Sequence, residues 1–333
     1  MANINDVAKR AGVSKTLVSR VINNKKGVSE ENRKKITAAI EELGYRPNEL
    51  ARSLVLRRTK TIGVVFDGIH SGIYLDLIKG MEEGSISEGL NIVFSSSKYN
   101  ADIQINYLDF FVNGRSDGII IYGCYNNVDY LKRLSRTGFP FVLTEYEIPG
   151  YDVNNVLVDN FNGAYKGTEH LIKLGHKKIL HFTGDRHLKV SIDRLNGYLQ
   201  AIHDNGIKLD DDMVVHSRFY ERSGYENMKT VLDKLKRPFA VFCGSDAIAY
   251  GAIRAIYERG LKIPEDVAIV GFDDVQSLST DICFPSLTTV KQPFVEIGTT
   301  SVKLLSKAIK NPNKKAEKIL LNTELIVRKT CGG

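Results

Sequence analysis

The stretch that decides the amino-terminal fold is Asn3-Ile-Asn-Asp-Val-Ala-Lys-Arg-Ala-Gly-Val-Ser-Lys-Thr-Leu-Val-Ser-Arg-Val-Ile-Asn23. Its spacing predicts two short helices joined by a turn at Gly12, where a glycine can take a positive φ. At about 100° per residue, the second helix separates into two faces. Its apolar face contains Leu17, Val18, Val21 and Ile22. Its polar face contains Lys15, Thr16, Ser19 and Arg20. One face can pack on a core while the other reads a groove.

The ends of the helices carry capping residues. Asn3 is placed to cap the first helix, with Asp6 three residues on, and Ser14 is placed to cap the second. A third helix follows from Ser29, and its apolar stripe consists of Ile36, Ala39, Ile40 and Leu43. The order favours a helix-turn-helix unit, and a small helical bundle with a solvated basic face is the alternative.

The charge of the chain is concentrated at one end. The 333 residues carry a net charge of +7, yet residues 1–60 alone carry +8 and the remainder carries −1. A basic head on a nearly neutral body indicates a polyanionic partner such as nucleic acid.

After about residue 60, apolar runs alternate with amphipathic stretches. The expected strands are 61–67, 91–95, 118–122, 141–144, 156–159, 178–183, 239–243 and 267–272. Alternating strands and helices predict an α/β body of mostly parallel, doubly wound sheets. Its length suits two lobes with a cleft between them, and such sheets bind ligands beyond the carboxyl ends of their strands.

Several function classes lack support in the sequence. There is no secretory leader pattern and no apolar run of about 18 residues, so we expect a cytoplasmic protein. The cysteines show no metal-ligand spacing and are expected to be reduced; they are Cys124, Cys243, Cys283 and Cys331. Nucleotide-binding and hydrolase motifs are missing, and we expect neither catalysis nor a cofactor nor a metal.

From Asn3 to about Lys329, the chain resembles the lactose repressor (LacI/GalR) family of bacterial transcription regulators. The motifs that carry the resemblance are Asp6-Val-Ala, Ala11-Gly-Val-Ser, Val18-Ser-Arg-Val-Ile-Asn23, Leu43-Gly-Tyr-Arg-Pro-Asn48, Ala51-Arg-Ser-Leu54, Gly175-His-Lys-Lys-Ile179, Gly271-Phe-Asp-Asp274 and Leu287-Thr-Thr-Val-Lys-Gln292. Chance can supply one of them but not the ordered set.

The resemblance implies a domain plan. We expect a helix-turn-helix domain at 1–47, a hinge helix and linker at 48–60, and an effector-binding and dimerisation domain at 61–333. The body would be periplasmic-binding-protein-like. Its N-lobe would take about 61–160 and 292–318, and its C-lobe about 161–291 and 319–329.

The resemblance also implies the contacts to DNA. Lys15, Thr16 and Arg20 match the base-reading positions of the family, and a helix in the major groove can read bases with such side chains. Residues that match backbone-positioning roles are Ser14, Ser19, Asn23 and Tyr45. Two alternatives stay open here: Ser14 as a helix cap only, and Tyr45 as core packing.

The hinge contributes the remaining expected DNA contacts, which are Asn48, Ala51, Arg52 and Leu54. A helix in this segment is too short to be stable alone in water, so we expect it to form only in complex with operator DNA, as the family resemblance implies. In the family a hinge leucine enters the minor groove and kinks DNA, and Leu54 is the matching position. The alternative is that Leu54 packs on the body. Val55 departs from the usual alanine.

The family's effector positions correspond to Ser71, Tyr74, Glu145, Arg194, Phe219, Asp246, Asp273 and Gln292. Carboxylates and a guanidinium can hold paired hydroxyls while a ring stacks on an apolar sugar face, so this set favours a sugar-like effector. Each has a structural alternative: Asp246 as a helix cap, Phe219 as core, and Asp273 and Arg194 as surface charges.

Departures from the family leave the effector open. Ser245 stands where many relatives have asparagine, and Ser71-Gly-Ile-Tyr74 replaces the usual asparagine and an extra aromatic residue. The alternative effectors are a nucleoside or purine, or a phosphorylated carrier protein that would need basic residues such as Lys303 and Lys307. A non-regulatory solute-binding α/β protein is the alternative from another class.

Helix-turn-helix dimers read two half-sites about one helical turn apart, so we expect a homodimer on a pseudo-palindromic operator. The carboxyl terminus has no leucine heptads, and no tail-mediated tetramer is expected. The expected function is a repressor in which an effector closes the cleft and displaces the hinges from operator DNA.

Overall fold

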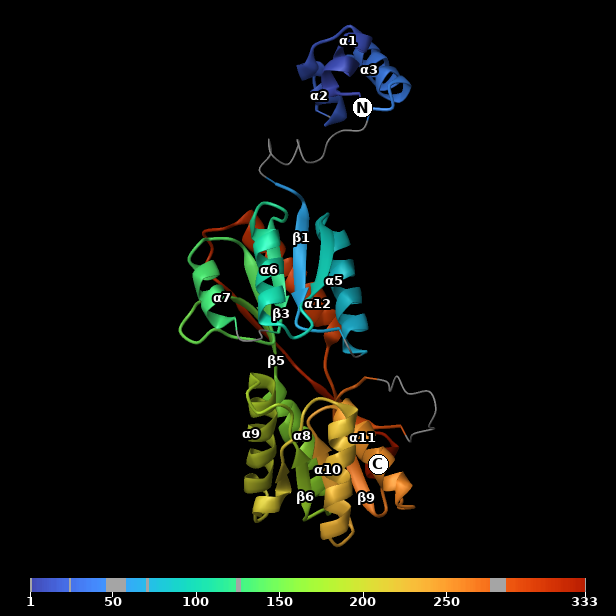
Figure 1. The fold of residues 1–333 in the computed structure, drawn as a ribbon, viewed down its shortest axis with the longest axis vertical. Helices are drawn as coiled ribbons and strands as arrows, with labels where there is room; N and C mark the ends of the chain where they lie inside the picture. The colour runs from blue at the N-terminus through green and yellow to red at the C-terminus, as the bar shows by residue number, and fades with distance from the viewer. Residues whose placement is uncertain are drawn as a thin grey trace. The chain divides into compact units, whose positions relative to one another are not determined.

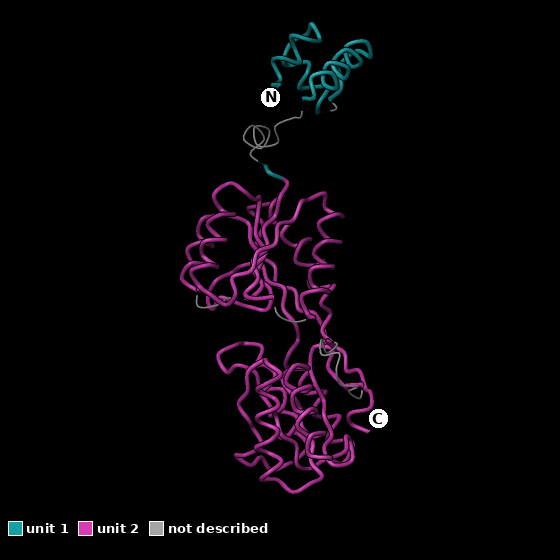
Figure 2. The backbone as a smooth tube through the Cα atoms, turned by 45° about the vertical axis from the view of Figure 1, so that its right-hand side comes forward, with its two compact units in different colours: residues 1–59 teal, residues 60–333 magenta. Residues whose placement is uncertain are grey.

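The computed structural model describes residues 2–23, 25–45, 58–69, 72–123, 127–275 and 286–332. The chain forms two compact units, Met1–Thr59 and Lys60–Gly333 (Figure 2). The hinge positions Asn48, Ala51, Arg52 and Leu54 lie outside the described residues, as do Ser71, Cys124 and Cys283.

The first unit is a three-helix bundle of α1 (Ile4–Ala11), α2 (Lys15–Ile22) and α3 (Glu30–Glu42). The predicted caps are confirmed. The Asn3 side chain accepts from the backbone N–H of Asp6 while the Asp6 carboxylate accepts from that of Asn3. The Ser14 hydroxyl accepts from the backbone N–H of Leu17 in α2, and the Ser29 hydroxyl accepts from that of Asn32 in α3.

A small apolar core holds these helices together. Its buried members are Val7, Ala8, Val18, Val21, Ile36 and Ala39. Leu17, Ile22 and Tyr45 pack against them while half-buried. The predicted apolar face of α2 therefore faces the core, and its polar face is left outward.

The second unit contains two six-stranded sheets, one in each lobe (Figure 1). The first-lobe sheet has the order β11-β5-β4-β3-β1-β2, and all its pairs are parallel. Its strands are β1 (Thr61–Phe66), β2 (Asn91–Ser96), β3 (Gly118–Tyr122), β4 (Phe141–Thr144), β5 (Asn154–Val158) and β11 (Lys318–Leu321).

Helices cover both faces of this sheet. Two apolar clusters, one on each face, alternate along β1: Val64 belongs to the first and Val65 to the second. Helices α5 (Ile73–Glu88) and α12 (Phe294–Lys310) pack with the first cluster. Helices α6 (Ala101–Val112) and α7 (Val128–Ser135) pack with the second (Figure 1). This is the doubly wound arrangement that the alternation predicted.

The second-lobe sheet has the order β12-β10-β9-β8-β6-β7. Its strands are β6 (Ile179–Phe182), β7 (Val214–Val215), β8 (Phe239–Cys243), β9 (Val267–Asp273), β10 (Thr288–Lys291) and the antiparallel β12 (Glu324–Ile326). Its helices are α8 (Asn160–Lys173), α9 (Lys189–Asp204), α10 (Glu221–Lys234) and α11 (Asp246–Glu258). Short 3-10 turns lie at Asp211–Met213 and Lys329–Cys331.

The chain crosses between the lobes between β5 and α8, between β10 and α12, and between β11 and β12. The last crossing corrects the expected boundary by three residues. We expected the chain to leave the first lobe after residue 318, but β11 continues to Leu321 because Ile319 and Leu321 pair with Val156 and Val158 of β5.

Within the described ranges, no helix combines the length and apolar character that a membrane span needs. Cys243 and Cys331 are buried free thiols.

Candidate functional site

The polar face of α2 presents three exposed side chains, which are Lys15, Thr16 and Arg20. In the described part of the chain, none of these three side chains forms a hydrogen bond or ion pair that would tie it to the bundle. A cationic donor that is exposed and uncommitted can form hydrogen bonds with guanine O6 and N7. These side chains therefore present the chemistry that a base-reading face requires.

The flanking polar residues have structural roles of their own. The Ser14 hydroxyl accepts from the backbone N–H of Leu17 at 3.3 Å, so the capping role is present. The Asn23 side-chain amide donates to the Ser19 carbonyl at 2.7 Å and lies 3.4 Å from its hydroxyl. Tyr45 packs on the core of the bundle. Capping and packing are thus the contacts that the described structure shows for these residues.

The second candidate site lies at the carboxyl ends of the second-lobe strands. Asp273 ends β9, and its carboxylate accepts from the Gln292 side-chain amide at 2.7 Å. The Arg194 guanidinium of α9 lies 3.4 Å from the same carboxylate oxygen. Arg194 and Asp273 are 4% and 8% exposed, so both are buried rather than surface charges. Three expected effector residues thus meet at one point.

Arg194 is held from several sides. Its NH1 group donates to the Gly244 carbonyl at 2.6 Å, and its Nε donates to the Asn160 side-chain oxygen at 2.8 Å. Its guanidinium carbon lies 3.7 Å from the centroid of the Phe272 ring and 5.8 Å from that of Phe219. Stacking on an aromatic face suits a planar delocalised cation, so these contacts fix its orientation.

Phe219 itself approaches the backbone at Gly184. A Cβ at Gly184 would lie 2.0 Å from the Phe219 ring and 2.5 Å from the Ser191 hydroxyl, so only glycine fits there. The Ser191 hydroxyl is buried and has no hydrogen-bond partner within the described residues. Phe219 is half-buried, which suits either a stacking surface or peripheral core.

Glu145 follows β4 of the first lobe and reaches toward Arg194 through Asn160. The Asn160 side-chain amide lies 3.4 Å from the Glu145 carboxylate while its oxygen accepts from Arg194. Burial raises the pKa of Glu145 to about 7, partly offset by the charge of Arg194. Its Oε1 atom is buried with no partner in the described structure. The Oε1 atom of Gln292 is likewise buried and has no hydrogen-bond partner among the described residues.

Tyr74 of α5 lies on the first-lobe side, where its hydroxyl donates to the Asp67 carboxylate at 3.0 Å. Its ring meets Tyr122 edge-on, with centroids 5.8 Å apart. Burial raises the pKa of Tyr122 well above its ordinary value, and the charges of Glu145, Asp67 and Asp273 add to the rise. Tyr122 therefore lies within electrostatic reach of groups from both lobes.

Asp246 is not the helix cap that was the alternative to its expected effector role. Ser245, not Asp246, caps α11 by accepting from the Ile248 N–H, which corrects the capping alternative. The Asp246 carboxylate accepts from the Thr289 hydroxyl at 2.6 Å and from the Val275 N–H at 2.7 Å. Burial raises its pKa well above the ordinary value, and the charge of Asp273 adds to the rise. Both carboxylate oxygens are thus engaged inside the lobe.

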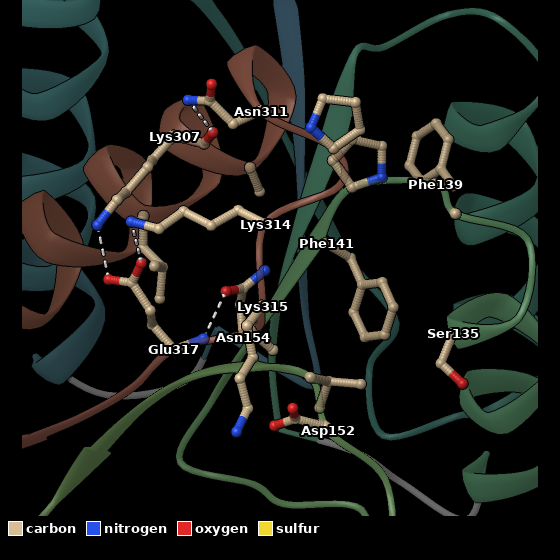
Figure 3. A pocket seen from close by; sticks show the side chains of 17 residues that line it. Ser135, Phe139, Phe141, Asp152, Asn154, Lys307, Asn311, Lys314, Lys315 and Glu317 are labelled. Carbon is tan, nitrogen blue, oxygen red and sulfur yellow. Dashed lines mark hydrogen bonds and ion pairs between the residues drawn. The ribbon is translucent and has the colours of Figure 1, made fainter.

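Two cavities lie outside the cluster around Arg194. One of about 160 Å³ lies where the first-lobe strands begin; there Glu317 pairs with both Lys307 and Lys314 (Figure 3). None of the expected effector residues lines it. The other, of about 220 Å³, includes Glu145 and Asn160 and lies beside the crossing from β5 to α8. Only the second adjoins the expected site.

Asn160 is the functional candidate that the sequence analysis missed. It is 3% exposed and begins α8 directly after the crossing from the first lobe. A polar residue directly after a predicted strand is the pattern that could have identified it, because ligands bind beyond the carboxyl ends of such strands.

Comparisons with known proteins match the two parts of the chain that carry these sites. Residues 3–48 match the family described as "Bacterial regulatory proteins, lacI family", and residues 168–331 match the "Periplasmic binding protein-like domain". The chain is 35% identical over 333 residues to the HTH-type transcriptional repressor PurR of Proteus mirabilis (strain HI4320), covering 99% of this chain and 97% of the relative.

Solved structures show the same similarity. The Lac repressor dimer bound to operator and the anti-inducer ONPF is 29% identical with a TM-score of 0.87, and 99% of each chain is covered. The transcriptional regulator CelR in complex with cellobiose is 29% identical with a TM-score of 0.74, covering 99% of this chain and all of the other.

Proposed function

This chain belongs to the LacI family of bacterial regulatory proteins and is a DNA-binding transcriptional repressor, and we propose that its effector is a small sugar-like molecule. The relatives are transcriptional repressors and not enzymes. Operator DNA and a small-molecule effector are its partners. Because operator DNA lies in the bacterial cytoplasm, we propose that the protein is cytoplasmic.

One observation carries the proposed effector class: Arg194, Asp273 and Gln292 converge from different elements beside an aromatic ring. The buried Glu145 and Gln292 oxygens without partners can accept hydroxyl donors from a ligand. A polyhydroxylated ring offers several such donors and an apolar face for Phe219. The similarity to a regulator solved with cellobiose supports the same class.

A purine or nucleoside is the second candidate, because the chain is 35% identical to a PurR repressor. Ring nitrogens and exocyclic groups can also pair with Asp273 and Arg194. A phosphorylated carrier protein has less support. Lys307, one of the lysines considered for it, is already paired with Glu317 at 2.7 Å.

For DNA, we propose that Lys15, Thr16 and Arg20 read bases in the major groove. Ser14, Ser19, Asn23 and Tyr45 would position the head on the phosphates, and the hinge at 48–60 would place Leu54 in the minor groove. The exposure of the first three side chains supports the assignment. Effector binding would then close the cleft and weaken the operator complex.

We propose a homodimer as the binding form, since two heads are needed for a two-part operator. Helix α5 carries two exposed apolar side chains, Leu75 and Ile86, which are 70% and 73% exposed. They are eleven residues apart, about three helical turns, and so share one face. Val93 on the neighbouring edge strand β2 is 43% exposed. This α5/β2 surface suits burial against a second copy.

The experiment is a thermal-shift screen of the full chain with cellobiose, D-ribose and hypoxanthine. A ligand that prefers the folded state raises the melting temperature. We expect a sugar to do so in the wild type but not in an Asp273→Asn variant. A shift with hypoxanthine alone would replace the proposed class with the purine class.

A further inference from the structure

Strand β9 of the second lobe ends in a turn with unusual backbone angles. Asp273 has a φ of 117° and Asp274 a φ of 62°. Residues other than glycine adopt positive φ only against strain, and the strain persists only where surrounding contacts hold the backbone in place. The turn of residues 273–275 therefore needs a clamp.

Arg328 supplies one side of the clamp from the carboxyl-terminal segment. Its NH2 group pairs with the Asp274 carboxylate at 2.7 Å, and its NH1 group donates to the Leu287 carbonyl at 2.8 Å. Its own backbone N–H donates to the Thr288 hydroxyl at 2.8 Å. The Asp274 side chain is 18% exposed and that of Arg328 is 33% exposed, so water weakens the pair only in part.

Asp246 and Thr289 supply the other side. The Thr289 hydroxyl donates to Asp246 while the backbone N–H of Asp274 points to the same hydroxyl at 3.4 Å. The Val275 N–H donates to the second Asp246 oxygen. The turn is thus held between α11, β10 and the carboxyl-terminal segment.

The two ends of this turn face different partners. Asp273 faces Arg194 and Gln292 in the proposed effector site. Val275 packs against the first-lobe apolar cluster that includes Phe66 and Tyr74. Three consecutive residues therefore connect the effector site, the carboxyl-terminal segment and the opposite lobe.

We propose that Arg328 is a positioning residue that holds the turn of residues 273–275, so that effector engagement at Asp273 is transmitted to the first lobe through Val275. The proposal rests on the effector role proposed for Asp273. It gives the carboxyl-terminal segment a part in the effector response although Arg328 itself need not touch the effector.

The first test is hydrogen–deuterium exchange of the full-length protein without effector. In an Arg328→Gln variant we expect the amides of the turn to exchange at least about fivefold faster, because the strained backbone loses its charged anchor. The rest of the second lobe should stay unchanged. Arg328→Lys should restore part of the protection, since it keeps the charge but not both guanidinium contacts.

Arg259→Gln is the matched control, because Arg259 pairs with Asp233 at 2.6 Å on the same lobe, away from the turn. It should leave exchange of the turn unchanged. Unchanged exchange of the turn in Arg328→Gln, or a uniform rise across the lobe, would overturn the positioning role.

The second test uses calorimetry with cellobiose, D-ribose and hypoxanthine as probes. For a probe that binds the wild type, Arg328→Gln should weaken binding at least about tenfold. Operator affinity without the probe should stay within about twofold. Val275→Ala should retain probe binding but lose most of the probe's effect on operator affinity. Wild-type binding by Arg328→Gln, or an unchanged response in Val275→Ala, would refute the proposal.

The two proposals fail separately. If none of the three probes binds the wild type, the effector class is wrong, and the exchange experiment still decides the role of Arg328.

Discussion

Positive φ angles occur at two proposed effector residues as well as at loop residues such as Lys60 and Lys98. Glu145 has a φ of 62°, and Asp273 and Asp274 share the positive range. Such conformations cost of the order of 1–3 kcal/mol each and persist where other contacts determine the backbone. At Glu145 the backbone N–H donates to the Val156 carbonyl at 3.0 Å, which continues the β4–β5 pairing into the strained residue. Strand pairing thus fixes where this carboxylate points.

The buried carboxyl of Glu145 predicts a pH dependence of stability. Its pKa is raised from 4.5 to about 7 by burial, so the folded state holds this proton more tightly than the unfolded state. The stabilisation of the folded state by the protonated Glu145 carboxyl is fully present below about pH 4.5, and it is lost as the pH rises through about 7. Glu145→Gln keeps a neutral side chain at every pH, so it should remove this pH dependence and raise the free energy of unfolding by up to about 3 kcal/mol at pH 8.

Urea unfolding at pH 5 and pH 8 measures this effect. The variant and the wild type should be closer in stability at pH 5. Glu324→Gln, at an exposed carboxylate, is the control and should show no such divergence. Parallel pH profiles of Glu145→Gln and wild type would contradict the prediction.

The contribution of Arg20 to operator affinity can be tested by removing its side chain. It is exposed at the last turn of α2 and forms no ion pair with the described residues of the head. Arg20→Ala should cost about 1–3 kcal/mol of operator binding, since a bidentate contact to guanine has this magnitude. A gel-shift titration measures it. Lys35→Ala, in which the lost ammonium pairs with Glu31 on α3, should bind almost normally; equal losses in both variants would argue against α2 as the reading helix.

At the scale of elements, local signals were predictable and distant ones were not. Asn3, Ser14 and Ser29 follow from capping rules that involve residues two or three positions away. The alternation of strands and helices likewise predicted the doubly wound sheets that the structure contains. Asn160 contacts Arg194 across 34 positions and Arg328 contacts Asp274 across 54, and no periodicity encodes such pairs. Arg194 and Asp273 were found through family resemblance.

The two roles of Ser14, as the cap of α2 and as a proposed phosphate contact, can be separated by substitution. Ser14 caps the helix through a hydroxyl that an aspartate carboxylate can replace. Ser14→Asp should keep the stability of the head but bind operator more weakly, because the carboxylate repels phosphate. Ser14→Ala should destabilise the head by about 1 kcal/mol.

Hydrogen–deuterium exchange of residues 2–45 in the full chain reports head stability, and operator titration reports binding. If Ser14→Asp binds operator as well as wild type, Ser14 is a cap only. That outcome would remove it from the DNA-contacting set and leave the rest unchanged.

At the scale of the whole body, the lobes are joined by three short crossings of the chain and by side-chain contacts such as that between Asn160 and Glu145. Asn160 lies on the first crossing and contacts both the first-lobe Glu145 and the second-lobe Arg194. An effector that favours one arrangement of the lobes must have a different affinity for the other. If it weakens operator binding, the operator must weaken effector binding by the same factor.

The α5/β2 surface predicts the dependence of operator affinity on assembly. Leu75→Asp combined with Ile86→Asp places two charges on an exposed helical face, so folding of the lobe should be retained. If a second copy covers this face, burying these charges is costly and the protein should become monomeric at micromolar concentration. A monomer engages one half-site at a time, and operator affinity should fall by about 10²–10⁴. Sedimentation and gel shift measure the two effects, and Leu209→Asp, at a 44% exposed leucine of the other lobe, is the control. A double variant that stays dimeric would mean that the copies associate through another surface, whereas a dissociated variant with full operator affinity would mean that one head suffices.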